Sequence, residues 1–271
     1  TGGVWRKKCI EEAGNWHADT LTEDLDLSYR AQLIGWRFVF LKDFTSPAEL
    51  PSEINALKAQ QFRWTKGAVE TAKKILPLVW KSKVPLRVKL QSTFHLTNNL
   101  VFPFILLAAI LNVPLIFIKN SGSHDVYFAI MSLFVLAFVS SFLFYMYSQK
   151  DIRADWRKKI VMFPLFMAGS MGLAVNNSRA VFEGLMNRKS EFVRTPKFKQ
   201  ESEKDTFIGN KYLNKKLGFS VIVEAILAVY CLIGVLSSIY FMEFASIPFQ
   251  VLFFLGFSFI AITSIRHTYA T

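Results

Sequence analysis

The sequence of 271 residues is poor in the residue types that carry metal and disulfide chemistry. It contains only two cysteines, Cys9 and Cys231, which lie far apart, so it offers neither a disulfide framework nor a Cys-x-x-Cys zinc site. Its four histidines are scattered without the spacing of metal ligands. Charged residues make up 19% of the chain and hydrophobic residues 52%, which excludes a disordered protein. The chain also lacks an initiator Met and a charged-then-apolar leader, and we expect it to be part of a longer protein.

The hydrophobic residues are concentrated in four long runs. A helix of 22 residues is about 33 Å long, whereas the hydrocarbon core of a bilayer is about 30 Å thick. Each run is therefore long enough to cross a membrane. The sequence predicts an all-α membrane domain with two transmembrane helical hairpins, at residues 94–147 and 219–265. The four runs are residues 94–118, 126–147, 219–241 and 247–265.

The basic residues predict the orientation of these hairpins. Thirty of the 32 lysines and arginines lie in residues 1–93 and 148–217, so both segments are expected on the cytoplasmic side. The opposite side then carries only residues 119–125, with Lys119 as its one basic residue, and a turn near Glu243. We expect an integral protein of the bacterial inner membrane, whose partner is the lipid bilayer. Nucleic acid is excluded as a partner because the basic residues are dispersed and form no reader motif.

A fifth apolar run, residues 160–177, is shorter and contains Pro164 and two glycines. If it also crossed, the ten basic residues from Arg179 to Lys216 would move to the outer side. We therefore expect an interfacial or re-entrant helix here. It lies within residues 148–218, the cytosolic segment between the hairpins.

The polar amino-terminal third reads as a folded cytosolic layer. Thr20 and Glu23 fit a capping box that opens a helix over residues 22–34. Residues 36–41 are expected to form a short strand, and Ser52 to cap a helix over residues 53–74. Residues 1–74 thus predict the end of an α/β domain, and residues 75–93 an amphipathic segment on the membrane surface.

Two short motifs in this third carry groups suited to catalysis. Thr22-Glu23-Asp24 places carboxylates at a helix start, where the helix dipole stabilises an ionised acid, although acidic residues are common there. Asp26 has the same signal and is equally consistent with an ordinary surface residue. In Gln60-Gln61-Phe62-Arg63-Trp64, amides, a guanidinium and an indole can grip a phosphate and a sugar ring together. Taken alone, this second motif is also consistent with a helix packed at the membrane boundary.

Thr-Glu-Asp, followed by Gln-Gln-x-Arg-Trp and then by membrane spans, resembles the processive family 2 glycosyltransferases, which include cellulose synthases and plant glucomannan synthases. Residues 1–6 and 48–51 also look like parts of that family. Residues 192–197, Phe-Val-Arg-Thr-Pro-Lys, resemble its gating loop, Phe-x-Val-Thr-x-Lys, with Arg194 in place of Val. The resemblance implies an α/β remnant of a GT-A-type glycosyltransferase domain, followed by a membrane domain with four transmembrane helices and interfacial helices.

The resemblance also implies a role for each matched residue. Asp24 would be the general base that activates the acceptor hydroxyl in an inverting displacement, positioned by Thr22 and Glu23. The second motif would bind the diphosphate and the acceptor, with Trp64 stacked under the acceptor sugar. The gating loop would close over the nucleotide sugar. The residues concerned are Gln60, Gln61, Arg63 and Trp64 in the motif, and Phe192, Thr195 and Lys197 in the loop.

The part of the family's domain that binds the donor and the metal would precede Thr1. The resemblance implies Mg²⁺ or Mn²⁺, but with no ligands in this chain, and we expect the 271-residue chain alone to transfer no sugar. The donor, UDP-glucose or GDP-mannose, stays open. One alternative is a non-processive enzyme that glycosylates a lipid. Another is a transporter subunit with a cytosolic domain, for which Glu224 within the third span is the best support.

Overall fold

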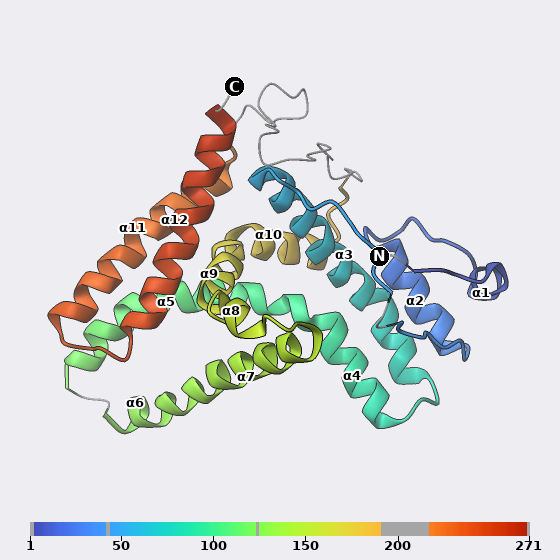
Figure 1. The fold of residues 1–271 in the computed structure, drawn as a ribbon, viewed down its shortest axis with the longest axis horizontal. Coiled ribbons are helices and arrows are strands. Elements are labelled where there is room, and N and C mark those ends of the chain that lie inside the picture. Colours follow the sequence, from blue (N-terminus) through green and yellow to red (C-terminus); the bar gives the residue numbers. More distant parts are fainter. Residues whose placement is uncertain (1–2, 42–43, 123–124, 191–216, 270–271) are drawn as a thin grey trace. The chain divides into compact units, whose positions relative to one another are not determined.

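The computed structural model describes residues 3–41, 44–122, 125–190 and 217–269. These residues form helices joined by irregular segments, as Figure 1 shows. They belong to two compact units. The first unit draws on Thr1–Pro103 and Asn176–Lys215, and the second on Phe104–Val175 and Lys216–Thr268.

The first unit is built around one long helix, α3, which spans Ile54–Lys81. Its partners are α1 (Lys7–Glu12), α2 (Glu23–Leu33), α4 (Leu86–Thr97) and most of α10 (Ala174–Leu185). One apolar cluster joins α1 to α2, and another joins α3 to α4 and also receives side chains of α2. The buried members are Cys9, Ala13, Leu27 and Ala31 in the first cluster, and Ala72, Ile75, Val79 and Leu96 in the second.

The second unit contains most of the long apolar helices. Its core lies between α5, α11 and α12, where Ala109, Cys231 and Phe257 are fully buried. The helices of this unit are α5 (Val101–Asn120, which begins in the first unit), α6 (Asp125–Met131), α7 (Val135–Ile152), α8 (Trp156–Ile160), α9 (Phe163–Gly172), α11 (Phe219–Tyr240) and α12 (Ile247–Tyr269); two short 3-10 turns, Asn98–Leu100 and Ser132–Phe134, lead into α5 and α7.

Among the residues that the structure describes, four helical segments are long and apolar enough to cross a membrane, in agreement with the four predicted apolar runs. They are Leu86–Asn120, Val126–Ile152, Phe219–Tyr240 and Ile247–Tyr269. The fifth apolar run, residues 160–177, lies mostly in α9 and the start of α10 and is not among these four. Its assignment as an interfacial or re-entrant segment stays a prediction.

The turn after α5 and the turn before α12 are joined by an ion pair between Lys119 and Glu243. Asn120 also donates to Glu243 Oε1, at 3.4 Å. Both turns were expected on the side of the membrane that is poor in basic residues. The ion pair supports that arrangement, because it requires the two turns to be at the same end of their helices.

The predicted strand at residues 36–41 is wrong, and the α/β remnant is not confirmed. The segment is irregular, and Phe38, Val39 and Phe40 expose 52%, 81% and 90% of their surface. A strand needs a neighbouring strand to satisfy its backbone hydrogen bonds. The residues that the structure describes supply no such neighbour.

Two predicted helix caps are also wrong. The residue before the first turn of α2 is Thr22 rather than Thr20, and no side chain caps that helix end. Helix α3 is capped by Glu53 rather than Ser52, since the Glu53 carboxylate accepts from the backbone N–H groups of Asn55 and Ala56 at 2.8 and 2.7 Å. Helix α3 also continues through Pro77 to Lys81 instead of ending before the proline.

Helices α9 and α12 cross at two glycines. A Cβ atom on Gly256 would overlap the carbonyl oxygen of Ala168 and would lie 3.0 Å from the backbone nitrogen of Gly172. Gly256→Ala should therefore destabilise the second unit by about 1–3 kcal/mol, because the added methyl separates the helices. The measurement is thermal unfolding of the purified protein in detergent. Gly169→Ala is the control, since nothing lies within 4 Å of a Cβ there; equal unfolding temperatures for the two variants would contradict the prediction.

Candidate active site

The first turn of α2 rests directly on α3. A Cβ atom on Gly67 would lie 2.6 Å from Thr22 Cγ2 and 2.8 Å from the Thr22 backbone nitrogen, so only glycine allows this approach. The Thr22 hydroxyl is hydrogen-bonded to that of Thr71 at 3.1 Å. The backbone N–H of Leu21 donates to Glu70 Oε2 at 3.0 Å. The start of the Thr22-Glu23-Asp24 motif is thus fixed to the middle of α3.

The Gln60–Trp64 motif lies one helical turn away from this contact. Gly67 follows Arg63 by four residues and Trp64 by three, so all three lie on neighbouring positions of one side of α3. The distance along the helix axis is about 5.4 Å per turn. The Trp64 indole is 42% exposed. The first motif, more than thirty residues earlier in the sequence, therefore contacts α3 one helical turn after the second motif.

The predicted catalytic residues differ in their exposure. Asp24 is exposed in the first turn of α2, and its Oδ1 accepts from the backbone N–H of Leu25 at 2.9 Å. Thr22 is buried and Glu23 half-buried. In the second motif, Gln60, Gln61 and Arg63 are all half-buried. The Asp24 carboxylate is therefore accessible from solvent, whereas the other residues of the two motifs, apart from Trp64, are at least partly buried.

Asp26 is completely buried, so its interpretation as an ordinary surface residue is wrong. Its Oδ2 accepts from Arg30 Nε and the terminal Nη2 at 2.9 and 2.8 Å. Lys74 Nζ on α3 lies 3.0 Å from Asp26 Oδ1. A buried carboxylate is tolerated only when such partners compensate for its lost hydration. The Asp26–Lys74 pair therefore ties α2 to α3 a second time.

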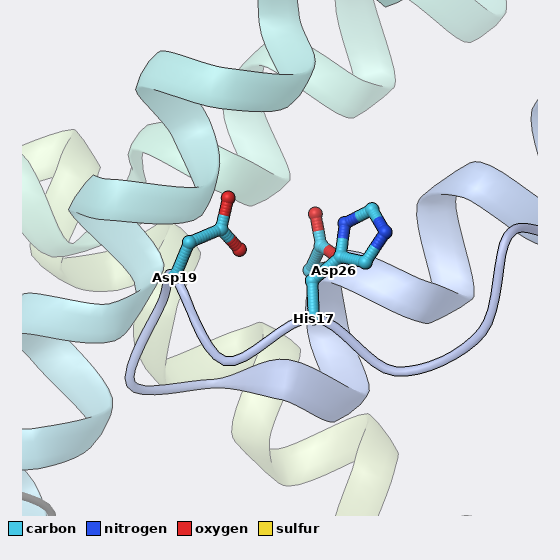
Figure 2. Close-up of side chains that lie close together, drawn as sticks. All are labelled: His17, Asp19 and Asp26. Atoms are coloured by element: carbon cyan, nitrogen blue, oxygen red, sulfur yellow. The ribbon is translucent and has the colours of Figure 1, made fainter.

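Figure 2 shows that His17, Asp19 and Asp26 point toward one another, and their potential ligand atoms all lie within 4.8 Å. This group does not fit Mg²⁺ or Mn²⁺. The Lys74 ammonium lies 2.9 Å from His17 Nδ1, 2.9 Å from Asp19 Oδ1 and 3.0 Å from Asp26 Oδ1, so it already takes the place of a cation. Its hydrogen bond to Asp19 lowers the pKa of that carboxyl below the ordinary value.

Helix α10 packs along another side of α3. The Arg179 guanidinium lies over the Phe62 ring at 5.5 Å and is bonded to Glu183 at 2.8 Å. Lys66 is fully buried, and its ammonium contacts Glu183 at 3.4 Å and the hydroxyl of Ser190. Burial raises the pKa of Glu183, but the bonds and charges of Arg179 and Lys66 outweigh burial and leave that pKa lowered.

This packing fixes the segment that leads into the predicted gating loop. Lys73 Nζ donates to the carbonyl of Leu185 at 2.8 Å and to Asn187 Oδ1 at 2.5 Å. Asn176 Nδ2 donates to the Lys58 carbonyl at 2.9 Å. Phe192, Thr195 and Lys197 themselves lie outside the described residues. Their predicted role in closing over a donor is therefore untested.

A pocket of about 740 Å³ lies beside the start of α2. This volume is within the range of about 300–1,000 Å³ that is usual for small-molecule sites. The pocket is bounded by the loop that leads to Thr22, by α3 and by the segment that leads to the predicted gating loop. Its lining residues are Ala18, Asp19, Thr20, Leu21, Glu70, Lys73, Lys74, Asn187, Arg188, Lys189 and Ser190.

Comparison with known proteins identifies the family. Residues 1–175 match the family model described as glycosyl transferase family group 2. The chain therefore belongs to this family of glycosyltransferases, as the Thr-Glu-Asp and Gln-Gln-x-Arg-Trp motifs predict. No solved structure matches the chain.

Among curated proteins, the chain is similar to plant enzymes named as probable glucomannan 4-beta-mannosyltransferases. It is 42% identical to number 10 of Arabidopsis thaliana over 123 residues, which cover 43% of this chain and 22% of the relative. It is 38% identical to number 15 of the same plant over 102 residues, 38% of this chain and 18% of the relative. It is 40% identical to number 4 of Oryza sativa subsp. japonica over 108 residues, 39% of this chain and 20% of the relative. The matched part thus spans about a fifth of these relatives.

Lys74→Gln should destabilise the first unit by about 1–3 kcal/mol, because the buried Asp26 carboxylate loses one charged partner and keeps only Arg30. The measurement is thermal or chemical unfolding of the purified protein. Lys81→Gln is the control, since Lys81 is exposed in the last turn of the same helix.

Addition of Mn²⁺ should leave the wild-type unfolding temperature unchanged. A rise in that temperature that His17→Ala abolishes would instead indicate a metal site.

Proposed function

We propose that the complete protein is a membrane-embedded, inverting hexosyltransferase that transfers a hexose from a nucleotide sugar to a growing β-glycan and helps to export the product. The main support is the contact of Thr22 with Gly67, which brings the Thr-Glu-Asp turn within one helical turn of Arg63 and Trp64 in a family 2 glycosyltransferase. The four apolar segments support a membrane location.

In this proposal Asp24 is the general base. Its carboxylate takes the proton of the acceptor hydroxyl while the oxygen attacks the anomeric carbon and the nucleoside diphosphate leaves, in one displacement that inverts the configuration. The contacts of Thr22 with α3 hold Asp24 in position, and Glu23 borders it.

The second motif binds the leaving group and the acceptor. Arg63 offers a planar, bidentate cation that compensates for the negative charge developing on the diphosphate, and Gln60 and Gln61 add hydrogen-bond donors. The exposed face of the Trp64 indole suits stacking on an acceptor sugar. A divalent cation, Mg²⁺ or Mn²⁺, would supply further charge compensation, with ligands outside this chain.

The donor proposed is GDP-mannose rather than UDP-glucose, because the similar plant proteins are named as mannosyltransferases.

We further propose that Phe192, Thr195 and Lys197 close over the bound donor. Attachment of α10 to α3 supports this role, because it holds the entry to that segment beside the second motif. The polar part is proposed to face the cytoplasm of a bacterial inner membrane; the relatives named above are plant proteins, and membrane fractionation tests the location.

Two alternatives have separate tests. A non-processive enzyme that glycosylates a lipid would give products of one or a few sugars, so product length distinguishes it. A transporter subunit is less well supported, because Glu224 is buried and engaged by an interaction partner rather than exposed in a polar pathway. The 271-residue chain alone is proposed to be inactive, which incubation of its membranes with labelled nucleotide sugars tests.

Asp24→Asn should reduce sugar transfer by about 10²–10⁴-fold, because an amide cannot accept the proton of the acceptor. The measurement is incorporation of labelled GDP-mannose and UDP-glucose by membranes that contain the full-length protein. Donor binding should be retained, since Asp24 acts on the acceptor. Glu11→Gln, which removes an exposed carboxylate of α1, is the control. Normal turnover by Asp24→Asn would assign the proton transfer to another residue.

Gly67→Ala should lower the transfer rate of the full-length protein by about 10²-fold. The added methyl group pushes the Thr22 turn away from α3 and so displaces the Asp24 carboxylate from the acceptor hydroxyl. The change should appear mainly in kcat rather than in donor affinity. Gly169→Ala, with open space around the new methyl group, is the control. An unchanged kcat would contradict the prediction, because it would mean that the position of Asp24 does not depend on the Gly67 contact.

A further inference from the structure

The second unit contains an elongated groove of about 870 Å³ that the proposed transfer reaction does not use. One wall is α5, a second is α6 with the start of α7, and the third is α12. The residues that the argument below uses are Ala108 and Asn112 on α5, Ala129 and Ser132 on the α6 side, and Ser246 and Phe249 by α12.

The first turn of α7 contacts α12 beside the groove, and the middle of α7 contacts α9. Phe138 contacts Phe163 and Phe249, in each case with 5.8 Å between ring centroids, and Tyr145 contacts Phe166 at 5.0 Å. Six residues that precede this aromatic cluster line the groove: Tyr127, Phe128, Ala129, Met131, Ser132 and Val135. The most apolar stretch of the Val126–Ile152 segment has no buried residue, which agrees with loose packing.

The largely apolar walls of the groove favour the binding of a hydrocarbon chain. Twelve of the eighteen lining side chains are alanine, leucine, isoleucine, methionine, valine or phenylalanine; the others are Asn112, Ser132 and Ser246 along the walls and Lys119, Tyr127 and Glu243 at one end. The hydroxyl groups of a glycan would lose hydrogen bonds to water here and find few replacements. An acyl chain is flexible, apolar and already present in the surrounding bilayer.

One end of the groove carries opposite charges side by side. Lys119 and Glu243 line it and form an ion pair, and Lys119 keeps 40% of its side chain exposed. Tyr127, also at this end, is exposed as is usual for aromatic residues at a membrane interface. A neighbouring cation and anion match the phosphate and the ammonium of a zwitterionic headgroup better than they match a headgroup with net negative charge.

We propose that this groove binds one phospholipid of the phosphatidylethanolamine class. Its acyl chain lies along α5 between α6 and α12, its phosphate contacts Lys119 and its ammonium contacts Glu243. The inference does not depend on the proposed transferase function, since it rests on the walls and the charged end of the groove alone.

Native mass spectrometry of the full-length protein, extracted from membranes in mild detergent and supplied with equal amounts of phosphatidylethanolamine and phosphatidylglycerol, tests the proposal. The wild type should retain one phosphatidylethanolamine. Ala108→Trp and Ala129→Trp, which fill the groove from opposite walls, should each lower the retained fraction at least tenfold. Leu107→Trp, next to Ala108 but outside the groove, should retain it. The double variant Lys119→Gln and Glu243→Gln should lose the preference between the two lipids.

Thermal unfolding in the same detergent separates loss of the site from loss of the fold. Added phosphatidylethanolamine should raise the unfolding temperature of the wild type and of Leu107→Trp, and leave that of the two filled variants unchanged. Absence of retained phospholipid in the wild type, equal retention by all tryptophan variants, or no headgroup preference would each overturn the proposal. A dimer that Ala108→Trp dissociates would assign the groove to a second copy, and a bound glycan would assign it to the product.

Discussion

The close approach of Thr22 to Gly67 is the constraint on which the candidate active site depends. Without a side chain at Gly67, the turn before Asp24 reaches the backbone of α3, and the hydroxyls of Thr22 and Thr71 pair across the contact. A purely apolar contact would leave α2 free to rotate about this point. The buried Asp26–Lys74 ion pair prevents such rotation, because a charge that left its partner inside the protein would cost several kcal/mol.

Helix α3 organises the first unit because it offers a different side to each partner. Gly67, Thr71 and Lys74, spaced by four and three residues, receive α2. Phe62, Lys66 and Lys73 are the positions that contact α10 and the residues after it. Phe62 belongs to the Gln60–Trp64 motif, so α10 contacts this motif directly. The contacts with α2 begin at Gly67, one helical turn after Arg63.

The sequence predicts best what local composition determines. The length of each apolar run is set by the thickness of the bilayer, so four spans could be predicted without any tertiary information. The strand at residues 36–41 could not be excluded, because strand formation depends on a partner that local sequence does not specify. The burial of Asp26 depends on Lys74, which follows it by 48 positions in the sequence. The one local signal that Asp26 has a structural role was its spacing of four residues from Arg30.

The two units achieve specific packing by different means, and the difference follows from their surroundings. In water, burial of apolar surface drives helices together but discriminates poorly between orientations, and in the first unit the buried charges of Asp26 and Lys66 select one orientation. In lipid, apolar burial gives little net driving force between helices, so close contact must come from small residues. Gly172 and Gly256 provide it between α9 and α12. No such small-residue contact closes the space between α5, α6 and α12, and the groove left there is the one that we propose a lipid fills.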